Sequence, residues 1–180
     1  MDELLYFAYG SNINLAQMAV RCPAATPVCL VVLDNYRLAF RGNMGFNGVA
    51  TIIPSQGEKV YGLLWKLTLA CELSLDRYEG YPRLYYKEQI TVRDRDGNRY
   101  SVMAYVMARE FCLEPAEPSQ HYLAGIVQGC KQNHLPVRPL FEALQRTHIE
   151  AAQAERPLWH QLNIDNITKP RHRKKNEPER

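Results

Sequence analysis

The first predicted strand and the turn that follows it read Leu4-Leu5-Tyr6-Phe7-Ala8-Tyr9-Gly10-Ser11-Asn12. Gly10 permits a positive φ and the close approach of a ligand to the backbone. Ser11 and Asn12 are residue types that cap helices, and we predict that they cap a short helix over residues 14–20. A strand, a tight turn and a helix start direct several unpaired N–H groups to one point. Taken alone, the tetrapeptide indicates only a turn.

Composition places the chain among ordinary globular proteins. It has 180 residues, of which 46% are hydrophobic and 23% charged, enough for one domain with its own core. The hydrophobic runs are much shorter than the ~20 residues that span a bilayer. The start, Met1-Asp2-Glu3, lacks the basic and apolar regions of a secretory signal. We therefore expect no membrane contact and a cytoplasmic location.

Charge is concentrated at the C-terminal end. Residues 169–180 contain six Lys and Arg residues against two Glu, a local charge of +4, so a total of +3 leaves the remainder at −1. We predict one domain over residues 1–156 and a basic, disordered tail over residues 157–180. The folded part shows no basic stripe, so nucleic-acid binding is not expected.

The cysteines are scattered and odd in number, and none forms a C-x-x-C pair or has a histidine at metal-ligand spacing. We expect them to be reduced and mostly buried, and we expect no metal site. They are Cys22, Cys29, Cys71, Cys112 and Cys130.

Most of the chain has the pattern of β-strands separated by short turns. β-Branched and aromatic runs predict strands over residues 28–34, 36–41, 49–53, 59–67, 85–93 and 98–107. The connections at residues 34–35, 42–48 and 54–57 are rich in Asn, Gly and Pro, which favours antiparallel neighbours. Asp96-Gly97 is a strong hairpin signal between the last two strands.

Helical signals follow the fourth strand and the last one. Thr68 is a predicted N-cap of a helix that runs to Tyr78, with Gly80 and Pro82 after its end. Apolar residues at i, i+4 spacing predict two more helices, which begin near Ser119 and Pro139. The predicted fold class is α+β: a mixed, mostly antiparallel sheet that curls into a small barrel with flanking helices.

Glu79 is the main candidate for chemistry. It stands at the end of the helix that begins after Thr68, where the helix dipole disfavours an acidic side chain. Burial and the helix end would both raise the pKa of its carboxyl, as a general base near neutral pH requires. From this residue alone, the pattern favours a solvated glutamate before a C-cap glycine over a functional residue.

Two motifs together resemble a known family. Tyr9-Gly10-Ser11-Asn12 is followed, in order, by strand blocks at residues 36–40, 48–52 and 60–65 and by Leu75-Asp76-Arg77-Tyr78-Glu79-Gly80. This combination resembles the γ-glutamylcyclotransferase superfamily, and its overall pattern is nearest to the bacterial AIG2-like type. The resemblance covers residues 4–107 and extends more loosely to about residue 145.

The resemblance implies an intramolecular aminolysis without a cofactor. The α-amine of a small γ-glutamyl amide attacks its own γ-carbonyl, which forms 5-oxoproline and expels the amine. Glu79 matches the family's acid/base. The family's glutamyl-binding turn corresponds to Tyr9, Gly10, Ser11 and Asn12. A further substrate-contacting tyrosine is either Tyr85 or Tyr86, and the spacing of the following strand favours Tyr85.

Other interpretations stay open. A catalytically silent binding or regulatory module of the same fold is the alternative to an enzyme. Ser11 has no histidine nearby in sequence to act as a base, and Gly10 belongs to no nucleotide-binding motif. Arg41 and Asn43 are candidates to line the pocket and recognise the leaving group. The leaving amine (from a dipeptide, a γ-glutamyl-lysine isopeptide or a protected amine intermediate) and the oligomeric state are not determined by the sequence.

Overall fold

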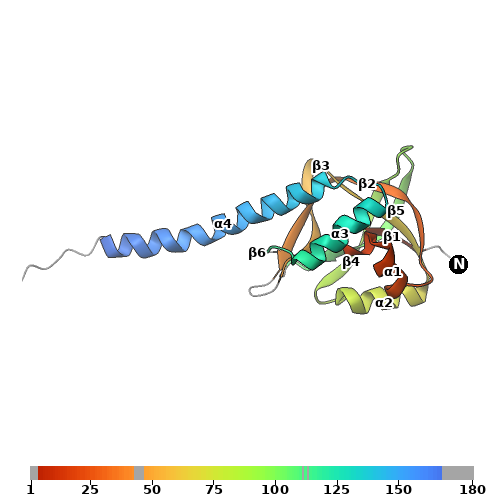
Figure 1. Cartoon of the computed structure of the whole chain (residues 1–180), viewed down its shortest axis with the longest axis horizontal. Coiled ribbons are helices and arrows are strands. Elements are labelled where there is room, and N and C mark those ends of the chain that lie inside the picture. Colours follow the sequence, from red (N-terminus) through yellow and green to blue (C-terminus); the bar gives the residue numbers. More distant parts are fainter. Residues whose placement is uncertain (1–3, 43–46, 111, 113, 168–180) are drawn as a thin grey trace, which may run out of the picture.

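The computed structural model describes residues 4–42, 47–110, 112 and 114–167, with side chains described as far as residue 154. Its centre is a closed barrel with the strand order β3-β1-β5-β4-β2, in which β2 also pairs with β3 and so closes the sheet (Figure 1). The short strand β6 pairs antiparallel with the end of β2. The strands are β1 (Leu4–Ala8), β2 (Thr26–Gly42), β3 (Val49–Leu67), β4 (Tyr85–Arg93), β5 (Arg99–Met107) and β6 (Glu114–Pro115).

Four α-helices flank the barrel in the described part of the chain, which confirms the predicted α+β class. Figure 1 shows that the last of them begins against the barrel and then extends away from it. A short 3₁₀ turn, Ser11–Ile13, precedes the first helix. The helices are α1 (Leu15–Arg21), α2 (Leu69–Glu79), α3 (Gln120–Gln132) and α4 (Arg138–Ile167).

Strand β1 is the central element of the barrel. It pairs antiparallel with β3 and parallel with β5, where Tyr6 lies opposite Met103. Phe7 and Ala8 are fully buried. Gly62 on β3 allows this close packing, because a Cβ at that position would lie 2.2 Å from the carbonyl oxygen of Ala8. The turn that follows β1 is therefore attached to a strand that is paired on both sides and tightly packed.

Two predicted turns proved wrong. The four strands expected between residues 28 and 67 form only two, β2 and β3, which pair along nearly their whole length. The register shifts between Asp34 and Tyr36, where Asn35 has a φ of 63° and Gly57 a φ of 80°. The Asn35 side chain accepts a hydrogen bond from the Gly57 N–H at 3.0 Å. These residue types interrupt the regular pairing of the two strands instead of reversing the chain.

The local signals for the hairpin and the helices were correct. Thr68 caps α2 by accepting from the Cys71 N–H at 3.2 Å, and Gly80 ends the helix with a φ of 68°. The β4–β5 hairpin is formed, and α3 begins after its cap at Ser119. Helix α4 continues to Ile167, beyond the expected boundary at residue 156, so the division into domain and tail stays a prediction. Residues 168–180, most of the expected basic tail, lie outside the described residues.

The five cysteines are free thiols, and Cys22, Cys71 and Cys130 are buried. Within the described residues, no helix is both long enough and apolar enough to cross a membrane. The cytoplasmic location stays a prediction.

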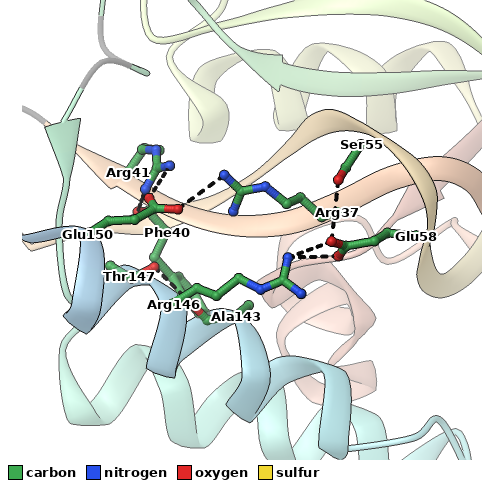
Figure 2. Close-up of polar contacts among 9 residues, drawn as sticks. All are labelled: Arg37, Phe40, Arg41, Ser55, Glu58, Ala143, Arg146, Thr147 and Glu150. Carbon is green, nitrogen blue, oxygen red and sulfur yellow. Dashed lines mark hydrogen bonds and ion pairs between the residues drawn. The ribbon is translucent and has the colours of Figure 1, made fainter.

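Ion pairs attach α4 to the barrel, as Figure 2 shows. Glu150 accepts from Arg41 and, at 3.2 Å, from Arg37, both on β2. Arg146 pairs with both carboxylate oxygens of Glu58 on β3, at 2.7 and 2.8 Å. The Arg41 side chain is only 8% exposed. The sequence suggested Arg41 as a residue that lines the pocket described below. In the structure its guanidinium pairs with Glu150 on α4, and Arg41 does not line that pocket. Asn43, the other candidate, lies outside the described residues.

We predict that Glu150→Ala lowers the free energy of unfolding by about 1–3 kcal/mol, because the buried Arg41 guanidinium loses its carboxylate partner. The measurement is urea denaturation at neutral pH. Glu142→Ala is the matched control on the same helix, since it removes only an exposed pair with Arg138 and is expected to cost less than about 0.5 kcal/mol. Equal losses in the two variants would contradict a structural role for the Glu150 contact.

Candidate active site

The turn after β1 differs from the sequence-based expectation in two details. Gly10 has a φ of −109°, so its role is not a positive φ. It provides space instead, because a Cβ there would lie 3.2 Å from Ala50 Cβ and 3.4 Å from the Tyr122 hydroxyl. The N-cap of α1 is Asn14, whose side chain accepts from the Gln17 N–H at 3.1 Å, and not Ser11 or Asn12. The latter two are buried in the 3₁₀ turn, where their side chains are left for other contacts.

Asn12 and Glu79 meet although 67 residues separate them in the chain. The Asn12 side chain is buried, and its Nδ2 donates to Glu79 Oε1 at 2.8 Å and to the Tyr6 hydroxyl at 2.9 Å. Its backbone carbonyl accepts from the Trp65 indole N–H at 3.1 Å. The predicted glutamyl-binding turn and the predicted acid/base therefore lie side by side.

A pocket beside this contact is lined mainly by tyrosines. Of the two tyrosines that competed for the site, Tyr85 points inward and is 5% exposed, whereas Tyr86 is 37% exposed and does not line the pocket. The lining residues are Tyr6, Tyr9, Gly10, Ser11, Asn12, Ala50, Glu79, Tyr85, Tyr105 and Tyr122. All six residues that the sequence assigned to the site are among them.

Four of the five pocket tyrosines divide into two groups by the direction of their hydroxyl hydrogen bonds, and the fifth, Tyr9, donates to the Tyr105 carbonyl. Tyr85 donates its hydrogen to the Ala50 carbonyl at 2.6 Å, and Tyr105 donates to Asp76 Oδ1 at 2.6 Å. Each of these oxygens retains only lone pairs for a ligand. Tyr6 and Tyr122 instead accept, from Asn12 and from the Ala50 N–H, and keep their hydrogens for donation. The pocket thus offers both acceptors and donors.

Burial sets the protonation of the pocket. It raises the pKa of the Glu79 carboxyl from 4.5 to about 7, while the Asn12 hydrogen bond and the Arg21 charge act in the opposite direction. Burial also raises the pKa of the Tyr6, Tyr9 and Tyr85 hydroxyls well above their ordinary value, so these groups stay neutral. Glu79 is therefore the group among the described pocket residues that exchanges a proton near neutral pH.

Sequence reasoning missed three pocket tyrosines, namely Tyr6, Tyr105 and Tyr122. Tyr6 and Tyr105 belong to the adjacent strands β1 and β5, and their rings meet edge to face with centroids 5.7 Å apart. Tyr122 comes from the first turn of α3. Period-2 alternation indicates which residues share a strand face, but it does not show which face becomes the pocket wall. No local signal marks Tyr122.

The structure combines a closed barrel with a tyrosine-lined pocket that contains a carboxyl with a raised pKa, an arrangement suited to acid/base chemistry. Comparisons with known proteins identify the family of the chain. Residues 6–124 match the family Gamma-glutamyl cyclotransferase, AIG2-like. The chain is 33% identical to human Gamma-glutamylcyclotransferase over 143 residues, which cover 76% of this chain and 74% of the human protein. The mouse protein of the same name is 34% identical over 142 residues, or 75% and 74% of the two chains. This chain belongs to the AIG2-like γ-glutamyl cyclotransferase family of enzymes.

Solved structures agree with this assignment. A structure named Gamma-glutamyl cyclotransferase superposes with a TM-score of 0.67 at 29% identity, covering 82% of this chain and 87% of the other. YkqA from Bacillus subtilis superposes with a TM-score of 0.66 at 21% identity, covering 82% and 55%, and shares the fold.

We predict that Glu79→Gln stabilises the folded protein at pH 8. The folded-state pKa of about 7 exceeds the ordinary value of 4.5, so the wild-type carboxyl favours folding below pH 4.5 and loses that contribution as the pH rises through 7. Because Glu79 is partly exposed to solvent, we expect the substitution to raise the free energy of unfolding at pH 8 by only about 2 kcal/mol. Glutamine retains the acceptor for Asn12 and carries no charge.

The measurement for this prediction is urea denaturation at pH 4 and pH 8. Glu79→Gln should have a higher free energy of unfolding than wild type at pH 8, and the difference should vanish at pH 4. The control Glu110→Gln replaces an exposed glutamate and should change neither value by more than about 0.5 kcal/mol. A Glu79→Gln effect of equal size at both pH values would contradict a desolvated carboxylate.

Proposed function

We propose that this enzyme cyclises the γ-glutamyl group of a small γ-glutamyl amide to 5-oxoproline and releases the amine, with Glu79 as the acid/base and without a cofactor. The observation that carries the proposal is the Glu79 carboxyl itself, which is held by Asn12 in a tyrosine-lined pocket with a pKa of about 7. A group that titrates near the working pH is suited both to remove a proton and to return it.

The reaction moves two protons from the α-nitrogen to the leaving nitrogen and consumes no water. Glu79 takes a proton from the substrate α-ammonium, and the freed amine forms an N–C bond with its own γ-carbonyl carbon. The bond from that carbon to the leaving nitrogen then breaks as Glu79 returns the proton to the departing amine. The second proton, which the ring nitrogen carries in excess after the attack, passes through Glu79 to the released amine, which leaves as an ammonium ion. Because nucleophile and electrophile belong to one molecule, the enzyme mainly has to hold the substrate in a curled conformation.

The directions of the hydrogen bonds suggest how the substrate is oriented. Glu79 and the lone pairs of Tyr85 suit the α-ammonium, which only donates. The free hydroxyl hydrogens of Tyr6 and Tyr122, with the backbone N–H groups of the 10–12 turn, suit the carboxylate and the oxygen that becomes negative in the transition state. Neutral tyrosines impose no repulsion on that charge.

The direct test is a panel of γ-glutamyl amides with different amines, in which 5-oxoproline and the free amine are both quantified. We expect equimolar release from at least one member and a loss of at least about 10²-fold in kcat for Glu79→Gln. Glu110→Gln should match wild type. If wild type and Glu79→Gln gave the same background on every member, the binding-module alternative would replace the enzyme proposal.

The pH profile is a separate prediction. Because Glu79 must be ionised to accept the first proton, kcat/KM should fall about tenfold per pH unit below a midpoint near 7. The measurement is kcat/KM between pH 5 and pH 9 with the best substrate of the panel. A plateau that continues down to pH 5 would contradict Glu79 as the base.

The two neighbouring tyrosines give a matched pair of variants. Tyr85→Phe removes an inward oxygen and should lower kcat/KM by about 1.5 kcal/mol of transition-state stabilisation, or roughly tenfold. Tyr86→Phe removes a hydroxyl from an exposed side chain on the same strand and should stay within about twofold of wild type. Steady-state kinetics decides the question, and equal effects would contradict the assignment of Tyr85.

A further inference from the structure

Arg21, the last residue of α1, lies behind the pocket and contacts the residues that build it. Its Nη1 donates to Asn12 Oδ1 at 2.6 Å and to Ser11 Oγ at 3.1 Å. Its Nη2 donates to the Tyr78 hydroxyl at 2.6 Å and to Gln17 Oε1 at 2.7 Å. The guanidinium carbon also lies 3.7 Å from the centre of the Tyr78 ring. One side chain thus joins α1, the 3₁₀ turn and the end of α2.

The contact with Asn12 determines which way its amide faces. A carboxamide has one accepting oxygen and one donating NH₂ group, whereas a guanidinium only donates. The side of Asn12 that faces Arg21 must therefore be Oδ1, and this leaves Nδ2 to donate to Glu79 and Tyr6. A reversed amide would place its NH₂ against the guanidinium and its oxygen against the Glu79 carboxylate. Both contacts would be repulsive.

We propose that Arg21 is a positioning residue for the cyclisation, which acts on Glu79 through the Asn12 amide and through its own positive charge. The inference rests on the proposed function. In the described residues Arg21 forms no ion pair with a carboxylate, so its charge is not neutralised locally. It therefore favours the ionised form of Glu79, which is the form that accepts the substrate proton.

The other titratable groups near Glu79 carry no positive charge, so none of them can replace the effect of Arg21 on the Glu79 pKa. They come from β1 and the turn after it, from β4 and β5, and from α3, and all are phenols that burial keeps neutral. These groups are Tyr6, Tyr9, Tyr85, Tyr105 and Tyr122. Arg21 is the one cation that acts on Glu79 among the described residues.

The shape of the guanidinium matters as well as its charge. Its planar fork serves four oxygen acceptors while it stacks on Tyr78, a geometry that an ammonium cannot reproduce. Arg21→Lys should therefore retain part of the electrostatic effect and lose the fixed orientation of the amide. Arg21→Met should lose both.

The experiment compares the pH profiles of wild type, Arg21→Met, Arg21→Lys and the control Arg77→Met, with the best γ-glutamyl amide of the panel. Arg77 is exposed and lies two residues from Glu79 on α2, and its substitution by methionine removes the same charge as Arg21→Met. In Arg21→Met we expect the acidic midpoint of kcat/KM to rise by about half a pH unit or more. We also expect kcat at pH 7 to fall about tenfold with a smaller change in KM. Arg21→Lys should lie between, and Arg77→Met should match wild type.

A merely structural role predicts a different outcome. If Arg21→Met lowered the melting temperature and kcat but left the midpoint unchanged, the proposal would be overturned. The double variant gives a second criterion. When Asn12 is already alanine, Arg21→Met should lower kcat at pH 7 by at most about threefold, because Arg21 can no longer act through the Asn12 amide. Full additivity of the two substitutions would contradict action through Asn12.

Titration of the Glu79 carboxyl by carbon NMR separates this inference from the proposed function. It needs no turnover, and it should show a higher midpoint in Arg21→Met than in wild type. Absence of 5-oxoproline with every wild-type assay would reject the function, whereas turnover by wild type with no shift in Arg21→Met would reject only the role of Arg21.

Discussion

The hydrogen bond from Asn12 Nδ2 to Glu79 Oε1 is the interaction on which the site depends, because it joins two parts of the chain that only the closed barrel brings together. Asn12 follows the central strand β1, and Glu79 ends the helix that leaves β3. Since β1 and β3 pair directly, from Leu4 opposite Leu67 to Ala8 opposite Leu63, each end of the contact is positioned by the same strand pair. A shift of one residue in that register would turn the side chains of β1 to the opposite face and move the turn away from Glu79.

The same packing supplies the low-polarity surroundings of the carboxyl. Tyr6 and Tyr105 meet across the β1–β5 pairing, and Tyr85 begins the strand next to β5. Their rings line the pocket, while their hydroxyls form hydrogen bonds with Asn12, Asp76 and the Ala50 carbonyl. Among the described residues, no buried side-chain nitrogen or oxygen lacks a hydrogen-bond partner altogether, which would cost about 1–3 kcal/mol for each such group.

The residues that the sequence proposed for the site line one pocket, whereas two of the predicted strand boundaries were wrong. The Tyr9–Asn12 turn, Glu79 and Tyr85 were identifiable because they belong to a motif pattern, and their spatial proximity follows from the fold that the pattern implies. The interrupted pairing at Asn35 and Gly57 was misinterpreted because the residues that reverse a chain also form bulges, and only the strand pairing distinguishes the two. Arg41 was only a candidate for the pocket lining, and the sequence contains no sign of its actual partner, which lies on a helix more than a hundred residues later. Tyr122 depends in the same way on the docking of α3.

A desolvated carboxyl alone would not be sufficient for the proposed acid/base role of Glu79. Burial without compensation would keep Glu79 protonated and remove the base, whereas a fully solvated glutamate, with a pKa near 4.5, would be too weak a base to take a proton from an ammonium group. The Asn12 donor and the Arg21 charge act against burial and bring the balance close to 7. Both depend on the same turn, since Asn12 belongs to it and Arg21 ends the helix that follows it. The turn that is proposed to hold the glutamyl group thus also influences the basicity of the residue that is proposed to move the proton. A change in the turn is therefore expected to alter binding and proton transfer together.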